Sequence, residues 1–207
     1  IILSGGPSSV YADHAPKVDP AIFSLEIPVF GICYGFQTMA AALNGVVAQT
    51  GKSEFGRTPL SVKSGSKVFA GLPESQSVWM SHGDAVSQAP AGFTVTAATS
   101  DTPIAAFEDA SGKLAGVQFH PEVVHTVNGM ILFKNFLEIA ELSFDWNMKS
   151  YLKNSVSKIK KEVGNRKVIC ALSGGVDSSV TAILIHKAIG DQLTCVYVNN
   201  GLMRKNE

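Results

Sequence analysis

The chain has 207 residues and no formal net charge, because 17 Lys and Arg residues balance 17 Asp and Glu residues. Hydrophobic residues make up 45% and charged residues only 16%, whereas soluble domains average about 25% charged residues. This composition excludes a disordered chain, which needs low hydrophobicity and high charge. It also disfavours a nucleic-acid binder, because no local run of Lys and Arg forms a basic patch.

The sequence also argues against a membrane or secreted protein. No apolar run reaches the roughly 18 residues of a membrane span, and the chain opens without the basic region of a signal peptide. The cysteines are Cys33, Cys170 and Cys195. Their odd number and wide spacing disfavour a disulfide framework and a structural zinc site. We therefore expect a cytoplasmic protein.

Strand-like and helix-like blocks alternate in the first two thirds of the chain, which is typical of an open mixed or parallel sheet flanked by helices. In chain order, the expected elements are strands at residues 1–3 and 28–32, a helix at 34–43, several β-rich segments between 46 and 106, a strand at 113–119 and a helix at 128–142. Together they predict an α/β domain over residues 1–143.

The composition changes near Ser143, and a second set of elements follows. These are a charged helix at residues 146–163, a strand at 168–172, a glycine loop at 173–177, a helix at 178–189 and a strand at 193–198. They predict the start of a second α/β domain over residues 146–207. Because a lone βαβ unit cannot cover both faces of its sheet, and because the chain opens on a strand without Met, we expect truncation at both ends.

A cysteine lies between an expected strand and an expected helix. The segment Gly31-Ile32-Cys33-Tyr34-Gly35 is the cysteine counterpart of the nucleophile elbow, in which flanking glycines permit a sharp turn. The positive end of the helix dipole favours the thiolate form of such a cysteine. A buried, inert cysteine is the alternative, but the two glycines favour a nucleophile.

A nucleophilic cysteine needs a base and a group that orients the base. His120-Pro121-Glu122 supplies both, since residues i and i+2 of an extended segment point the same way. Strand ends of an open α/β sheet gather at one edge, so His120 can meet Cys33. His82, in Ser81-His82-Gly83-Asp84, is the rival base. For the oxyanion of acyl transfer, the backbone N–H groups of Tyr34 and Gly6 are the expected donors.

Three segments resemble the signatures of class I glutamine amidotransferases: Ser4-Gly5-Gly6-Pro7, the stretch from Gly31 to Gln37, and Phe119-His120-Pro121-Glu122-Val123. The resemblance implies that Cys33 attacks the side-chain amide of glutamine and that His120 moves the proton. Ammonia then leaves, and water hydrolyses the glutamyl thioester. The resemblance also implies that glutamine is held by Gln37, Ser81, His82 and Gly83.

A second site is expected in the glycine loop. It consists of Ser173, Gly174, Gly175, Val176, Asp177, Ser178 and Ser179. Successive glycines let backbone N–H groups converge on an anion, and a helix N-terminus adds its dipole. Asp177 makes a magnesium ion plausible, because a carboxylate together with phosphates suits that ion. The alternative is a glycine-rich turn in which Asp177 caps the helix.

The loop resembles the PP-loop of ATP pyrophosphatases, and its order after a class I glutaminase is similar to the glutamine-hydrolysing GMP synthase family. That family adenylates XMP with ATP and magnesium, and ammonia then displaces AMP to give GMP and pyrophosphate. The resemblance implies glutamine, ATP and XMP as substrates and a homodimer formed through a C-terminal region absent from this chain. We therefore expect that this chain does not complete the synthetase half. Many relatives carry Asp where Asn199 stands.

Two other functions remain open from the sequence. One is a different cysteine hydrolase with the same elbow, such as a γ-glutamyl peptidase. The other is a non-catalytic nucleotide-binding module in which Cys33 is only structural.

Overall fold

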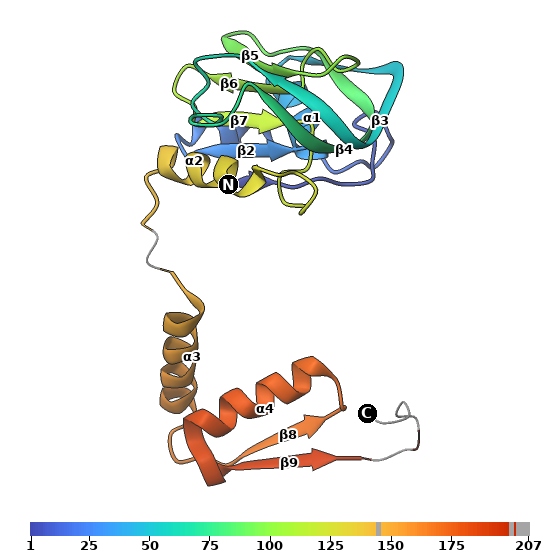
Figure 1. Cartoon of the computed structure of the whole chain (residues 1–207). Helices are drawn as coiled ribbons and strands as arrows, with labels where there is room; N and C mark the ends of the chain where they lie inside the picture. The colour runs from blue at the N-terminus through green and yellow to red at the C-terminus, as the bar shows by residue number, and fades with distance from the viewer. Residues whose placement is uncertain (144–145, 199–200, 202–207) are drawn as a thin grey trace. The chain divides into compact units, whose positions relative to one another are not determined.

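A computed structural model describes residues 1–143, 146–198 and 201 of the chain, which forms two compact units (Figure 1). The first unit is Ile1–Leu142, and the second begins at Ser143. Asn199 lies outside the described residues.

The first unit is built on a mixed seven-stranded sheet with the strand order β1-β2-β7-β6-β5-β3-β4. The strands are β1 (Ile2–Leu3), β2 (Val29–Ile32), β3 (Val46–Val62), β4 (Ser75–Gln88), β5 (Phe93–Ala98), β6 (Ala106–Asp109) and β7 (Leu114–Val117). Strands β1, β2 and β7 run parallel to one another, and the other neighbours are antiparallel. The carboxyl ends of three adjacent parallel strands therefore meet at one edge.

Two helices cover opposite faces of this sheet, because the side chains of β2 alternate between two cores. The helices are α1 (Tyr34–Ala42) and α2 (Gly129–Ile139), and a short 3-10 helix, η1 (Pro20–Ser24), precedes β2. Val29 belongs to the same buried cluster as Phe36 of α1. Phe30 packs on the other side against Phe136 of α2, with ring centroids 5.0 Å apart. The predicted open sheet flanked by helices is confirmed.

Strands β3 and β4 form one long hairpin of 17 and 14 residues, where the sequence predicts several shorter segments. A register shift between Gln49 and Glu54 interrupts the pairing, and Gly51 within it has a φ of 70°. Such a bulge breaks the alternation of apolar and polar residues that marks a continuous strand. Beyond the bulge, Glu54 is the register partner of His82.

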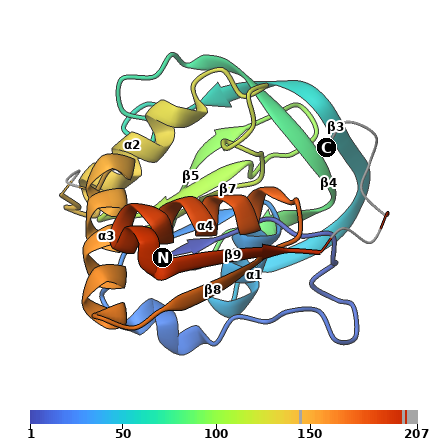
Figure 2. The same ribbon diagram turned by 90° about the horizontal axis from the view of Figure 1, so that it is seen from below.

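The second unit holds a βαβ motif preceded by a helix. Its elements are α3 (Met148–Val163), β8 (Val168–Leu172), α4 (Val176–Ile189), the 3-10 helix η2 (Gly190–Gln192) and β9 (Leu193–Tyr197). Strands β8 and β9 are parallel, and α4 lies along them in both Figure 1 and Figure 2.

Several predicted helix boundaries are wrong by a few residues. Helix α4 begins at Val176 rather than at residue 178, so Val176 and Asp177 belong to its first turn. Helix α2 ends at Ile139 rather than at residue 142, because Glu141 has a φ of 53° that no α-helix accommodates. Helix α3 begins at Met148, after a capping box made by Asn147 and Ser150. Within the part of the chain that the structure describes, none of the helices combines the length and apolarity needed to cross a membrane.

Candidate active site

Cys33 lies at a sharp turn between β2 and α1. Its φ of 50° and ψ of −107° are strained for a residue with a Cβ atom. The Cys33 backbone N–H donates to the Val117 oxygen at 2.9 Å, which ties the turn to the end of β7. A Cβ atom on Gly35 would lie 2.1 Å from the Leu3 oxygen, and one on Gly31 would lie 2.8 Å from the Phe36 backbone. Both flanking positions therefore require glycine, as the elbow pattern predicts.

His120 and Glu122 follow β7, the strand next to β2. The Nδ1 atom of His120 lies 2.7 Å from Oε1 of Glu122. The backbone N–H of His120 donates to the Trp79 oxygen of β4 at 2.9 Å. Sequence reasoning missed Thr126, a buried residue whose hydroxyl donates to the His120 oxygen at 2.6 Å and accepts from the Trp79 N–H at 3.0 Å. Thr126 therefore clamps the His120 backbone against β4.

The His120 imidazole is held in its charged form. A hydrogen bond with Cys33 is the largest cause that raises the pKa of His120, from 6.5 to about 9; burial opposes the rise, and Glu122 adds to it. His120 Cε1 and Cys33 Cβ also lie 3.1 and 3.6 Å from the place where a Cβ atom on Gly5 would stand. The structure thus brings together a sulfur, an imidazole and a carboxylate from the ends of two adjacent strands.

A pocket of about 500 Å³ opens at this edge of the sheet. The predicted site residues that line it are Gly6, Cys33, Tyr34, Gln37, Ser81, His82, Gly83 and His120. Glu122 supports His120 from outside the lining. The segments that the sequence picks out for nucleophile, base, oxyanion donors and substrate contacts therefore face one cavity, large enough for an amino-acid substrate.

Two glutamines organise the pocket around the sulfur. Nε2 of Gln118 lies 3.7 Å from the Cys33 sulfur, and Nε2 of Gln37 lies 3.1 Å from Oε1 of Gln118. Gln37 Nε2 also donates to the Asp84 oxygen at 2.7 Å. The amide nitrogen of Gln37 is thus bonded within the protein, while the residue still lines the pocket. Sequence reasoning missed Gln118, which no motif marks.

His82, the rival base, is engaged on both sides of its ring. Its Nδ1 lies 3.0 Å from the Asp84 oxygen, and its Nε2 lies 3.2 Å from Oε2 of Glu54 on β3. Its side chain is 1% exposed. Asp84 stands two residues after His82, but its carboxylate accepts from the Ser9 hydroxyl. The carboxylate beside the His82 ring is Glu54, from the other strand of the hairpin. With both ring nitrogens bonded within the protein, His82 has no nitrogen free to act as a base.

In the second unit, the glycine loop turns its hydroxyl groups toward its own backbone. Ser178 and Ser179 each donate to the Gly175 oxygen at 3.0 Å, and the Ser173 hydroxyl lies 3.2 Å from that of Ser178. Gly174 has a φ of 84°, and Gly175 is the N-cap of α4. Asp177 is exposed in the first helical turn. The loop therefore has the predicted position at the end of β8 and the start of α4.

Comparison with known proteins identifies the family. Residues 1–140 match the family model described as glutamine amidotransferase class-I. The chain belongs to the class-I glutamine amidotransferase family. Residues 147–205 match the NAD synthase family model. This second match supports the predicted PP-loop α/β fold of the second unit.

Curated relatives match the whole chain. It is 56% identical over 208 residues to a protein of Carboxydothermus hydrogenoformans and 57% identical over 209 residues to one of Streptomyces avermitilis, both named GMP synthase [glutamine-hydrolyzing]. All of this chain is covered, but only 41% and 40% of those relatives. Among solved structures, a protein of Thermoplasma acidophilum described as a GMP synthase subunit has a TM-score of 0.56 at 34% identity, covering 58% of this chain and 60% of that one. The chain thus spans about two fifths of the length of these curated relatives.

Proposed function

We propose that the first unit hydrolyses glutamine to glutamate and ammonia, with Cys33 as nucleophile, His120 as proton carrier and Glu122 as the group that orients His120. The observation that carries this proposal is geometric: Cys33 and His120 line one pocket, and both side chains lie within 3.6 Å of the place where a Cβ atom on Gly5 would stand. The 2.7 Å bond between His120 and Glu122 supports it. A cysteine paired with a charged histidine is activated as a thiolate without a separate deprotonation step.

The first half of the reaction forms a thioester. The Cys33 thiolate attacks the amide carbon of glutamine, a C–S bond forms, and the carbonyl electron pair moves to oxygen. Backbone N–H groups of Gly6 and Tyr34, which line the same pocket, are the proposed donors to this oxyanion. His120 then gives its proton to the leaving nitrogen, the C–N bond breaks, and ammonia departs.

The second half restores the enzyme. Neutral His120 accepts a proton from water as the water oxygen attacks the thioester carbon. A C–O bond forms, the C–S bond breaks, and glutamate leaves with Cys33 again a thiolate and His120 again charged. The sum is glutamine plus water giving glutamate plus ammonia. Gln37 and the segment from Ser81 to Gly83 are proposed to hold the glutamine.

For the whole protein we propose a cytoplasmic, homodimeric GMP synthase that uses this ammonia, ATP and XMP. High identity to curated GMP synthases along the full chain supports this assignment. The glycine loop from Ser173 to Ser179 is proposed to bind the pyrophosphate part of ATP, since it combines glycine N–H groups with a helix N-terminus.

The glycine loop offers one carboxylate, that of Asp177, as a ligand for magnesium. The described residues contain no group of three or more His, Cys, Asp or Glu side chains that could hold a metal by themselves. Asp177 is therefore the proposed protein ligand, and nucleotide phosphates and water supply the others, which is the usual arrangement for magnesium. When bound, the ion neutralises phosphate charge. The serine hydroxyls and the loop backbone orient the phosphates.

Ammonia release from glutamine tests the proposal. The chain should release ammonia, the Cys33→Ala variant should not, and Cys195→Ala, which alters an exposed cysteine in the second unit, should behave as the unaltered chain. A glutamine-analogue electrophile should label Cys33, and glutamine should protect it. Labelling that glutamine does not slow, together with cleavage of γ-glutamyl peptides, would instead identify a γ-glutamyl peptidase.

A further inference from the structure

We propose that Glu54 is a positioning residue for the glutamine pocket, acting through the buried ring of His82 on the segment from Ser81 to Asp84. This inference rests on the proposed glutaminase function and adds a residue that no motif marks. Glu54 lies on β3, does not line the pocket and is 7% exposed.

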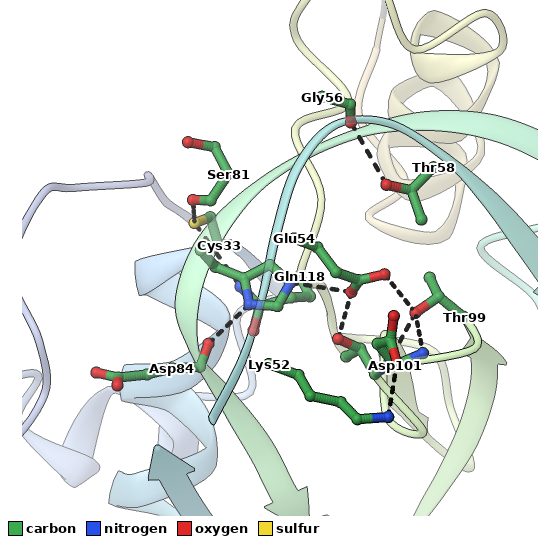
Figure 3. A network of polar contacts seen from close by, with 12 residues as sticks. Cys33, Lys52, Glu54, Gly56, Thr58, Ser81, Asp84, Thr99, Asp101 and Gln118 are labelled. Carbon is green, nitrogen blue, oxygen red and sulfur yellow. Dashed lines mark hydrogen bonds and ion pairs between the residues drawn. The ribbon is translucent and has the colours of Figure 1, made fainter. Parts of the chain in front are cut away.

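The Glu54 carboxylate is bonded on both oxygens. Its Oε1 accepts from the Thr99 hydroxyl at 2.8 Å (Figure 3). Its Oε2 accepts from the Thr102 hydroxyl and lies 3.2 Å from His82 Nε2. Thr102 and His82 are both buried. A carboxylate removed from water is tolerated when its lone pairs are satisfied in this way.

The His82 ring carries this support into the pocket. Both of its nitrogens face acceptors, the Glu54 carboxylate and the Asp84 backbone oxygen 3.0 Å away. The ring therefore bridges the Glu54 carboxylate and the Asp84 backbone oxygen, and it fixes the backbone between Ser81 and Asp84.

The backbone from Ser81 to Asp84 contacts Cys33 at one end and Gln37 at the other. The Ser81 backbone oxygen lies 3.6 Å from the Cys33 sulfur, as Figure 3 shows. The Asp84 oxygen accepts from Gln37 Nε2 at 2.7 Å. The Asp84 side chain accepts from the Ser9 hydroxyl at 2.5 Å, in the loop that follows Gly6. A shift of this segment would therefore change the pocket wall while leaving the His120–Glu122 bond in place.

The segment from Ser81 to Asp84 forms part of the wall of the pocket in which glutamine is proposed to bind. Ser81, Gly83 and Asp84 line the cavity together with Cys33 and His120. Replacing Glu54 by Gln keeps the shape but puts an amide N–H₂ group where donors converge, so at least one buried partner loses its acceptor. A lost bond to a charged group weakens binding by about tenfold or more. The loss should fall on glutamine binding, since the thiol and the imidazole stay in place.

The experiment compares Glu54→Gln with Glu108→Gln in the full chain. Glu108 is an equally buried carboxylate on β6 that bonds Ser66 and the backbone N–H groups of Lys67 and Val68, away from the pocket. Steady-state ammonia release gives KM and kcat, iodoacetamide gives the intrinsic rate of Cys33 alkylation, and thermal unfolding gives stability.

We expect Glu54→Gln to raise KM for glutamine about tenfold, to change kcat and iodoacetamide alkylation less than twofold, and to keep a cooperative unfolding transition. Glu108→Gln should lower stability but leave KM unchanged. Thr102→Val should raise KM in the same direction as Glu54→Gln, whereas Thr102→Ser, which keeps the hydroxyl, should restore it. The Thr102→Val and Thr102→Ser variants keep the inference testable if Glu54→Gln does not fold.

Equal KM values for the unaltered chain, Glu54→Gln and Thr102→Val would overturn the inference and leave the glutaminase assignment intact. The same holds if Glu108→Gln raises KM as much as Glu54→Gln. If the unaltered chain releases no ammonia from glutamine, the proposed function itself fails and the inference fails with it.

Discussion

At the scale of single residues, the chemistry of the site depends on how His120 is charged. Its pKa is raised to about 9, chiefly through the hydrogen bond with Cys33 and then through Glu122. The folded-state pKa therefore lies above the ordinary value of 6.5. The stabilisation that follows from this shift is fully present below about pH 6.5 and is lost as the pH rises through about 9.

Because Cys33 raises the His120 pKa more than Glu122 does, variants of these two residues should differ. Cys33→Ala should lower the His120 pKa more than Glu122→Gln does, because the Cys33 bond is the larger contribution. NMR titration of the His120 ring in each variant measures this directly. In the active Glu122→Gln variant, the alkaline loss of glutaminase activity should move to lower pH than in the unaltered chain. A larger fall in the His120 pKa for Glu122→Gln than for Cys33→Ala would contradict the assignment.

Sequence patterns mark the proposed catalytic residues, but they do not mark the residues that support them. Cys33, His120 and Glu122 stand in local patterns at strand ends, and topology alone brings such ends together. Gln118, Thr126 and Glu54 act through partners far along the chain; Glu54, for example, meets His82 only through the register of a bulged hairpin. No local spacing records such a contact, so it could be found only from the fold.

At the scale of elements, the elbow depends on how closely α1 approaches β1. The Gly35 N–H donates to the Ser4 oxygen at 3.1 Å, and the Leu3 oxygen occupies the space where a side chain would begin. The first helical turn and the first strand are therefore in backbone contact, and Cys33, the proposed nucleophile, stands beside that contact.

Gly35→Ala should consequently destabilise the fold by about 3 kcal/mol, the upper part of the range for overpacking, because backbone atoms cannot rotate away from the added methyl group. Urea denaturation of both proteins measures the difference in the free energy of unfolding. Gly6→Ala is the matched control, since its Cβ atom would lie 3.7 Å from the Tyr34 ring, an ordinary contact. Equal stability of the two variants would show that β1 and α1 can move apart.

Element type was easier to predict than element length. Strand β8 has the predicted bounds, and α1 differs by one residue. Strands β3 and β4 were divided into pieces because the bulge near Gly51 and the glycines in both strands resemble turns in a sequence. Their continuity comes from pairing with each other, which is a tertiary effect.

At the scale of the whole molecule, the two units differ in the size of their buried hydrophobic cores. Both large buried clusters, with residues such as Phe30 and Phe36, lie within the first unit. In the described part of the second unit, the buried hydrophobic residues are Cys170, Ala182, Ala188 and Ile189, each 8% or 9% exposed. A domain of about 60 residues is marginal even with a full core.

A chain ending at Leu142 should therefore fold and release ammonia from glutamine at a rate within about threefold of the full chain. Circular dichroism during urea denaturation should show one cooperative transition for it. For the full chain, an additional transition at lower urea should report the second unit. If the shortened chain instead unfolds without cooperativity, the first unit depends on residues beyond Leu142.

The left-handed backbone at Cys33 has a consequence for protein engineering. Glycine adopts such angles without cost, whereas every residue with a Cβ atom is strained there. A library selected only for heat resistance would accordingly favour glycine at position 33 and enrich inert molecules. Position 33 must be held constant, or each round of selection must also require turnover, if a hardier catalyst is the goal.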